Sequence, residues 1–141
     1  MSQENVEIVR QLNRAFNRGD IEALVALLGE EIAIEDVNNA PDLPPVVYGK
    51  EGARRLFAAW VEAFDELRIE IEESIDAGDH VVCVVKYYGK NQRSGLTVDD
   101  KGVDVWQVRD GKCVRGTLGY ADREEALEAV GLSEQDAHAD S

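Results

Sequence analysis

Residues 103–120, VDVWQVRDGKCVRGTLGY, contain the clearest indication of the fold. Two strand-like apolar runs flank Asp110-Gly111. This dipeptide favours a two-residue hairpin turn because both turn positions take positive φ angles. We therefore predict paired strands over 103–109 and 112–120.

The segment before this hairpin extends the same pattern. Residues 68–75 alternate between apolar and charged side chains, and 76–79 (DAGD) predict a turn. Residues 80–88 are apolar on both parities, which is typical of a strand that is covered on both faces. These runs predict an antiparallel meander of long strands. Residues 99–102 (DDKG) fit either a turn or a bulge within one long strand.

The first half of the chain predicts helices. Apolar residues recur every three or four positions over 5–18, which indicates an amphipathic helix. Gly19-Asp20 can end this helix and cap a short second helix over 21–28. Residues 53–64 carry the strongest helical periodicity in the chain.

Shorter signals complete the order of elements. A strand is expected over 32–37, followed by a loop at 38–45 that contains all three prolines. A capping box at Asp122 predicts a short helix over 124–130, and 133–141 are expected to form an acidic flexible tail. Helices followed by hairpin-linked strands indicate the α+β class. A curved sheet wrapped around three helices would leave a pocket between the long helix and the sheet.

Composition limits the possible functions. The 141 residues fit one domain, 1–132, and a net charge of -14 disfavours nucleic acid and anionic membranes, because both attract basic faces. No apolar run approaches the ~20 residues that span a bilayer, and the first residues lack a signal-peptide pattern. We expect a cytoplasmic protein. Cys83, Cys113, His80 and His138 show no metal-ligand spacing, so no metal site is expected.

Several short motifs resemble one known family. They are Asn17-Arg18-Gly19-Asp20, residues 23–28, Gly49, the helix around Trp60, Ala77-Gly78-Asp79, and Trp106 with Arg109-Asp110-Gly111-Lys112. Together they resemble the SnoaL-like group of the nuclear transport factor 2-like superfamily, which also holds the ketosteroid isomerases. The resemblance covers about 5–132. It implies a cystatin-like conical α+β barrel, with a strongly curved antiparallel sheet wrapped around the three helices of the N-terminal half. The same fold carries isomerases, polyketide cyclases, hydratases and proteins without known activity.

The resemblance also implies site residues. Ketosteroid isomerases use an Asp base, and a tyrosine together with a protonated Asp stabilises the enolate. Glu35-Asp36 stands where the family has its base, and Val103-Asp104-Val105-Trp106 matches the strand that carries the protonated Asp. The family's tyrosine falls at Leu12 here, so one of two oxyanion donors is missing.

Strand parity supports both carboxylates as pocket residues. Asp36 shares parity with Ile34, and Asp104 shares parity with Trp106. In an apolar pocket, desolvation raises both pKa values and repulsion raises one further, which gives a base (Asp36) beside a neutral donor (Asp104). Two structural alternatives stay open. Asp36 can begin the turn that follows it, and Asp104 can pair with Arg115 or Lys86 on a neighbouring strand.

Aromatic residues are the other pocket candidates. We expect the ligand to contact Trp60, Trp106, Phe57, Leu12, Tyr48 and Tyr120, although aromatics at such spacing also serve as core. Four tyrosines could replace the donor missing at Leu12, namely Tyr48, Tyr87, Tyr88 and Tyr120, and Tyr120 at the end of the last strand is preferred.

Two hypotheses for the function follow. The first is a cofactor-independent isomerase or cyclase that acts through Asp36 on a small, mostly apolar carbonyl compound. The second is a non-catalytic module for a small ligand or a partner protein, with an open or filled pocket and Asp104 ion-paired to Arg115. Val103 and Val105, opposite in parity to Asp104, and the outer parity of 80–88 place apolar residues on the convex sheet face. Members of the family usually dimerise through this face, so the resemblance implies a homodimer there. Residues 80–120 carry seven basic and four acidic side chains. We therefore expect basic side chains near Asp104, and their charge allows a ligand that bears a carboxylate.

Overall fold

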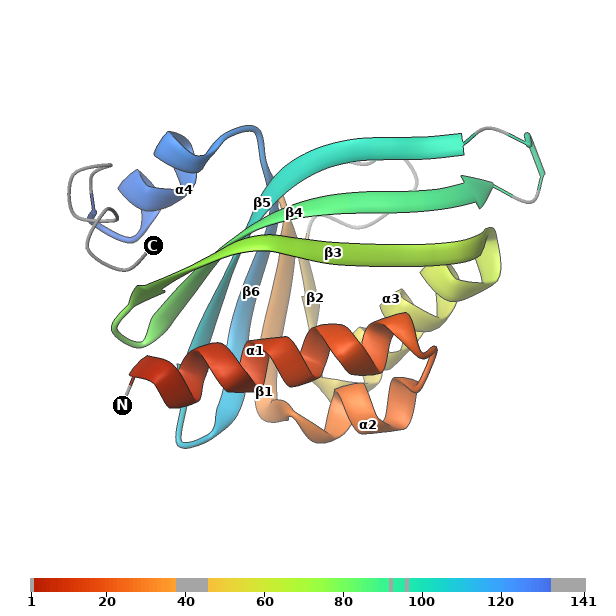
Figure 1. The fold of residues 1–141 in the computed structure, drawn as a ribbon. Helices are drawn as coiled ribbons and strands as arrows, with labels where there is room; N and C mark the ends of the chain where they lie inside the picture. Colours follow the sequence, from red (N-terminus) through yellow and green to blue (C-terminus); the bar gives the residue numbers. More distant parts are fainter. Residues whose placement is uncertain (1, 38–45, 92, 96, 133–141) are drawn as a thin grey trace.

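The structure is a computed structural model that describes residues 2–37, 46–91, 93–95 and 97–132 (Figure 1). The predicted loop at 38–45 and the predicted tail at 133–141 lie outside the described residues. The elements are α1 (Ser2–Asn17), α2 (Ile21–Ala26), β1 (Leu28–Asp36), β2 (Val46–Tyr48), α3 (Gly49–Ala63), β3 (Phe64–Ala77), β4 (His80–Asn91), β5 (Thr97–Arg109), β6 (Lys112–Tyr120) and α4 (Arg123–Ala129). The predicted α+β class is confirmed.

The strands form one curved sheet in the order β2-β1-β6-β5-β4-β3. Helices α1, α2 and α3 lie on its concave side, and α4 lies on the opposite side (Figure 1). The pairs are antiparallel except for β1 with β6, which run parallel. The prediction of an antiparallel sheet is therefore wrong for this one pair. Hairpin signals describe neighbours in sequence, and they do not reveal how a distant strand enters the sheet.

The hairpin between β5 and β6 forms as predicted. Asp110 and Gly111 have φ angles of 51° and 77°, the left-handed values that a two-residue hairpin turn requires. The ambiguous segment 99–102 belongs to β5, which pairs with β4 without a break in register. The meander therefore contains strands of 12 to 14 residues at β4, β5 and β3.

Helix ends follow the predicted capping residues. Gly19 has a φ of 71°, and the Asp20 side chain accepts a hydrogen bond from the Ala23 N–H at 3.1 Å. The Asp122 carboxylate accepts from the Glu125 N–H at 2.9 Å and so caps α4. None of the helices that the structure describes is long and apolar enough to cross a membrane.

The apolar residues of the convex face are covered within the chain. Ala126 and Leu127 of α4 are fully buried against Val103, Val105 and their neighbours, in a cluster separate from the main core. The predicted homodimer is based in part on these same valines. Because α4 already shields them from water, their apolar character no longer points to a partner subunit.

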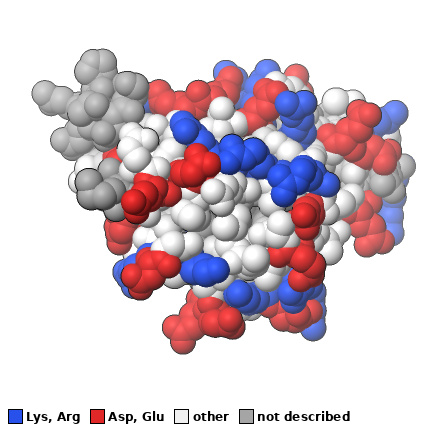
Figure 2. Space-filling view, turned by 60° about the horizontal axis from the view of Figure 1, so that its bottom comes forward, with Lys and Arg blue, Asp and Glu red and all other residues white. Residues whose placement is uncertain are grey.

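Charged residues are mixed over the outside of the helices. Arg14 pairs with Glu7 at 2.7 Å, and Arg54 pairs with Glu22 at 2.8 Å. Figure 2 shows that Lys and Arg side chains lie beside Asp and Glu over the visible face. On this face there is no broad basic field of the kind that attracts polyanions.

Candidate functional site

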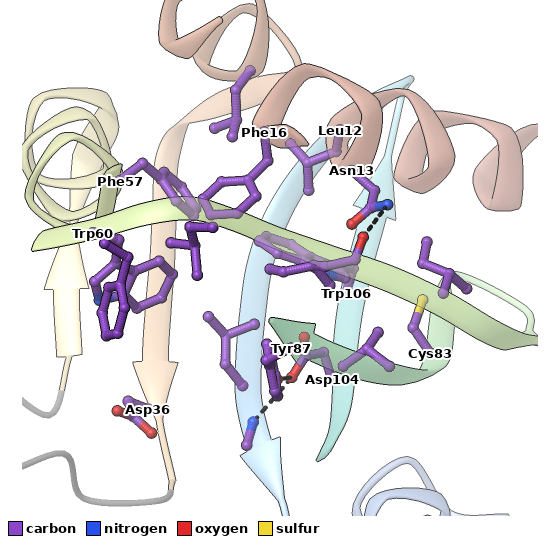
Figure 3. A pocket seen from close by; sticks show the side chains of 18 of the residues that line it. Leu12, Asn13, Phe16, Asp36, Phe57, Trp60, Cys83, Tyr87, Asp104 and Trp106 are labelled. Carbon is purple, nitrogen blue, oxygen red and sulfur yellow. Dashed lines mark hydrogen bonds between the residues drawn. The ribbon is translucent and has the colours of Figure 1, made fainter. Parts of the chain in front are cut away.

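A cavity of about 570 Å³ lies between the helices and the concave face of the sheet (Figure 3). Helices α1 and α3 form one wall, and strands β3 to β6 with the end of β1 form the other. The residues that line it are mostly apolar: Val9, Leu12, Asn13, Phe16, Leu24, Asp36, Phe57, Ala59, Trp60, Ala63, Phe64, Leu67, Ile69, Ile71, Cys83, Val85, Tyr87, Asn91, Asp104, Trp106, Leu118 and Gly119. A cavity of this size and character suits a small organic molecule.

Aromatic rings build one end of the cavity. The ring centroids of Phe57 and Trp60 are 5.5 Å apart, and those of Phe16 and Phe57 are 5.9 Å apart, in edge-to-face geometry. Trp106 is 7% exposed and lies over Gly116, where a Cβ atom would come within 2.5 Å of the indole ring. The lack of a side chain at Gly116 therefore allows the indole to lie flat against the strand.

Asp104 is the buried acid of the cavity, with only 5% of its surface exposed. Its Oδ1 accepts hydrogen bonds from the Tyr87 hydroxyl at 2.7 Å and from the Gly119 N–H at 3.0 Å (Figure 3). Burial raises the pKa of Asp104 from its ordinary value of 3.8 to about 6; the two hydrogen bonds lower it, and the charge of Asp36 raises it. The carboxyl can thus exchange a proton near neutral pH.

Asp36 faces the same cavity from another strand. It is the last residue of β1, half-buried, and its register partner is Leu118 of β6. Its charge contributes to the raised pKa values of both Asp104 and Tyr87. The two carboxylates that parity placed on the inner face therefore line one cavity, and the charge of Asp36 acts on Asp104.

The other predicted pocket residues divide into two groups. Phe57, Trp60, Trp106 and Leu12 line the cavity. Tyr48 and Tyr120 do not, and these two assignments are corrected: Tyr48 is 73% exposed on the edge strand β2, and Tyr120 packs against the cluster under α4. Tyr48 lies at an open strand edge and Tyr120 lies on the convex side of the sheet, so neither hydroxyl lines the cavity.

Tyr87 is the tyrosine that joins the two carboxylates in the cavity. It is one of four tyrosines that the sequence offers as the missing donor, with Tyr120 preferred among them. Residues 80–88 are apolar on both parities, so hydrophobicity alone could not show which side faces inward. The charged Lys86 was the usable signal: a lysine on the outer parity implies that Tyr87 points inward.

The basic residues of 80–120 do not surround Asp104. Lys86 approaches Asp99 at 3.7 Å, Arg115 pairs with Glu35 at 2.8 Å, and Arg109 is exposed. The ion pair between Asp104 and Arg115 that the non-catalytic hypothesis predicts does not form, and the expectation that basic side chains surround Asp104 is wrong. No Lys, Arg or His is among the described residues that line the cavity.

Within the described ranges, no group of three or more His, Cys, Asp or Glu side chains is placed to hold a metal ion. Cys83 lines the cavity, but burial raises the pKa of its thiol well above the usual range. It therefore acts as a neutral, weakly polar part of the wall.

A family model for the SnoaL-like domain matches residues 9–116. The chain belongs to the SnoaL-like family. The match begins within α1 and ends within β6, and it includes α2, α3, strands β1 to β5 and both cavity carboxylates of this SnoaL-like protein. No curated protein matches it.

Solved structures share the fold of this SnoaL-like protein. RV0760c from Mycobacterium tuberculosis, in complex with estradiol-17beta-hemisuccinate, has a TM-score of 0.73 and 19% identity over 82% of this chain and 92% of that chain. A hypothetical protein with a ketosteroid isomerase-like fold from Catenulispora acidiphila DSM 44928, in complex with trimethylamine, has a TM-score of 0.72 and 20% identity over 89% of this chain and 93% of that chain. An NTF2-like protein from Burkholderia pseudomallei K96243 has a TM-score of 0.73 and 21% identity over 91% and 98%. At such identities the likeness concerns the fold.

Proposed function

We propose that this SnoaL-like protein is a cofactor-independent isomerase or cyclase for a small, mostly apolar carbonyl compound. The observation that carries the proposal is the placement of two carboxylates, Asp36 and Asp104, in one apolar cavity. Burial and the charge of Asp36 raise the pKa of Asp104 to about 6, so below this pH Asp104 is a protonated hydrogen-bond donor. With Asp36 as the base, the pair needs no cofactor for the proton transfer.

The chemistry begins at the carbon next to the carbonyl. The Asp36 carboxylate accepts the proton of that carbon, and the electron pair of the broken C–H bond moves into the enolate. Protonated Asp104 donates a hydrogen bond to the enolate oxygen and stabilises its charge. In an isomerase the proton returns from Asp36 to a different carbon. In a cyclase the enolate carbon bonds to the carbon of a second carbonyl, and the C=O π bond opens to an alkoxide that takes the proton back from Asp36.

The lining residues also define the charge of the substrate. The described walls of the cavity contain two acids and no basic side chain. A carboxylate brought into this site would meet like charges with no cation to pair with, which costs binding free energy. The proposed substrate is therefore uncharged within the cavity, in contrast to the carboxylate-bearing ligand that the basic content of 80–120 allowed.

The non-catalytic alternative has less support. It predicted an open or filled pocket and an ion pair between Asp104 and Arg115. The cavity has a volume of about 570 Å³, and the hydrogen bonds of Asp104 come from Tyr87 and Gly119. The steroid part of the estradiol-17beta-hemisuccinate bound to RV0760c supports a ligand with an apolar body under either hypothesis. The hemisuccinate carboxylate of that ligand would find no basic side chain among the described residues that line the present cavity.

Solvent-deuterium exchange tests the enzyme proposal directly. A panel of apolar ketones in D₂O is incubated with the native protein, with Asp36→Asn and with the control Asp110→Asn, which changes an exposed hairpin residue in the same way. Native protein and control should incorporate deuterium beside the carbonyl, and Asp36→Asn should lower the rate by about 10²-fold or more. Undiminished exchange by Asp36→Asn would remove the assignment of the base.

A homodimer is a separate proposal, and the family resemblance is its support. Within the described residues, Tyr48 and Val61 are the large hydrophobic residues that stay exposed. A dimer would therefore use a surface other than the valines beneath α4. Sedimentation velocity at micromolar concentration measures the mass, and a monomer under those conditions contradicts the proposal.

A further inference from the structure

Tyr87 reaches Asp104 along an unusual path. In the register of β4 with β5, Tyr87 lies opposite Asp100, and Asp104 lies opposite Cys83, four residues further along β5. The hydroxyl of Tyr87 nevertheless donates to Oδ1 of Asp104 at 2.7 Å. The ring must therefore lean along β5. It crosses Gly102, which lies between Asp100 and Asp104 and has the same parity as both.

Gly102 makes this lean possible. A Cβ atom at Gly102 would lie 2.9 Å from Cε2 and 3.2 Å from the hydroxyl oxygen of Tyr87. Both separations are shorter than normal van der Waals contact, so any larger residue would push the ring away from Asp104. The glycine leaves the space that the tyrosine ring occupies, as often happens where an aromatic side chain covers a strand glycine.

The two hydrogen bonds to Asp104 meet at one oxygen. The Tyr87 hydroxyl and the Gly119 N–H both donate to Oδ1. Within the described residues, Oδ2 has no hydrogen-bond partner, and the side chain lines the cavity. A carboxyl oxygen that already accepts two hydrogen bonds is a poor place for a proton, because the proton would displace a donor.

We propose that Tyr87, held over Gly102, is a positioning residue that fixes Asp104 so that Oδ2 carries its proton and meets the ligand. The role of that proton in the reaction rests on the proposed function. The arrangement itself does not, because it is a property of the protein without substrate. Tyr87 thus acts through Asp104, and the structure places Oδ2, not the tyrosine hydroxyl, as the donor to the substrate oxygen.

The groups that surround Asp104 determine which residue a titration at this site reports. Tyr87 and Cys83 face it from β4, Asp36 faces it from β1, and β6 contributes the Gly119 N–H. Burial raises the pKa of the Tyr87 hydroxyl and of the Cys83 thiol, which keeps both neutral. A titration near pH 6 at this site therefore belongs to Asp104, with Asp36 as the neighbouring charge.

Carboxyl ¹³C NMR tests the proposal without any substrate. Four proteins labelled with ¹³C at aspartate Cγ are titrated with pH: the native protein, Tyr87→Phe, Gly102→Ala and the control Tyr88→Phe. The Asp104 resonance is assigned as the one that is missing from the spectrum of Asp104→Asn. Tyr88 is the matched control because its hydroxyl is directed at Glu70, 3.4 Å away, instead of Asp104. Loss of a hydrogen bond to an ionised group should raise the Asp104 midpoint by about one pH unit or more in Tyr87→Phe.

The outcomes separate this proposal from the proposed function. Gly102→Ala should shift the midpoint in the same direction, with circular dichroism showing that the variant is folded, and Tyr88→Phe should leave it unchanged. An unchanged midpoint in Tyr87→Phe, which retains the ring and so tests only the hydroxyl, overturns the proposal. A shifted midpoint with no deuterium exchange in any variant supports the positioning role and contradicts the enzyme. If the positioning role of Tyr87 and the enzyme proposal are both correct, the pH profile of deuterium exchange shifts together with the Asp104 midpoint measured by NMR.

Discussion

The hydroxyl of Tyr87 and the carboxylate of Asp104 are 2.7 Å apart, although their positions on β4 and β5 are four residues out of register. This hydrogen bond and the one from Gly119 stabilise the ionised form of Asp104, but no cation lines the cavity among the described residues. A buried carboxylate that has hydrogen bonds but no counter-ion is destabilising when charged.

This cost should appear as a pH-dependent effect of Asp104→Asn on stability. The folded protein holds the Asp104 proton up to about pH 6, whereas an ordinary value is 3.8. Between these values the folded state binds more protons than the unfolded state, so this residue's contribution to the free energy of unfolding falls as pH rises. Asp104→Asn should therefore stabilise the protein by up to about 3 kcal/mol at pH 7.5 and by little at pH 4.

Urea unfolding at the two pH values measures this difference. The control Asp110→Asn, on the exposed hairpin, should change stability equally at both. A gain for Asp104→Asn that does not depend on pH would contradict the buried, unpaired carboxylate.

Asp36→Asn should lower the pKa of Asp104. The charge of Asp36 is one of the causes that raise it, so its removal favours ionisation of the buried acid. Carboxyl NMR would show the Asp104 midpoint shifting toward acid, opposite in direction to the shift expected for Tyr87→Phe. If the midpoint stays in place, the two acids are not coupled, and the proposed division into base and donor loses its physical basis.

Two glycine-to-alanine changes should have opposite effects on stability. Gly52 lies within α3, and a Cβ there would meet Val47 at an ordinary 3.6 Å, so Gly52→Ala should stabilise by about 0.5–1 kcal/mol. At Gly116 the Cβ would be 2.5 Å from the Trp106 ring, and Gly116→Ala should destabilise by about 1–3 kcal/mol. Urea unfolding gives both values, and a change in tryptophan fluorescence should accompany only the second. Equal effects would show that the Trp106 wall is not tightly packed.

Ligand charge should control binding to the cavity. 2-Acetylnaphthalene and 2-naphthoate share one apolar skeleton, and the neutral ketone should bind at least about tenfold more tightly, because the carboxylate meets two acids. Quenching of Trp60 and Trp106 fluorescence reports binding. In Asp104→Asn the difference between the two ligands should narrow. A preference for the carboxylate would contradict the proposed uncharged substrate.

Local signals in the sequence accounted for much of the architecture. The Asp110-Gly111 turn and the caps at Asp20 and Asp122 form because each depends on a few neighbouring residues. Strand parity brought Asp36 and Asp104 to one face for the same reason, since alternation is a property of the strand itself.

Long-range pairing decided the remainder. The parallel pairing of β1 with β6 and the packing of α4 on the convex face depend on residues far apart in the chain. The packing of α4 buries Val103 and Val105, which had suggested a partner subunit. Tyr120, which had suggested a hydroxyl donor, packs against the same cluster instead of lining the cavity. The sequence by itself determined the α+β class and the inward-facing acids. Only the tertiary structure decided that Tyr87 completes the site, because a cross-strand hydrogen bond over Gly102 requires the actual register of β4 with β5.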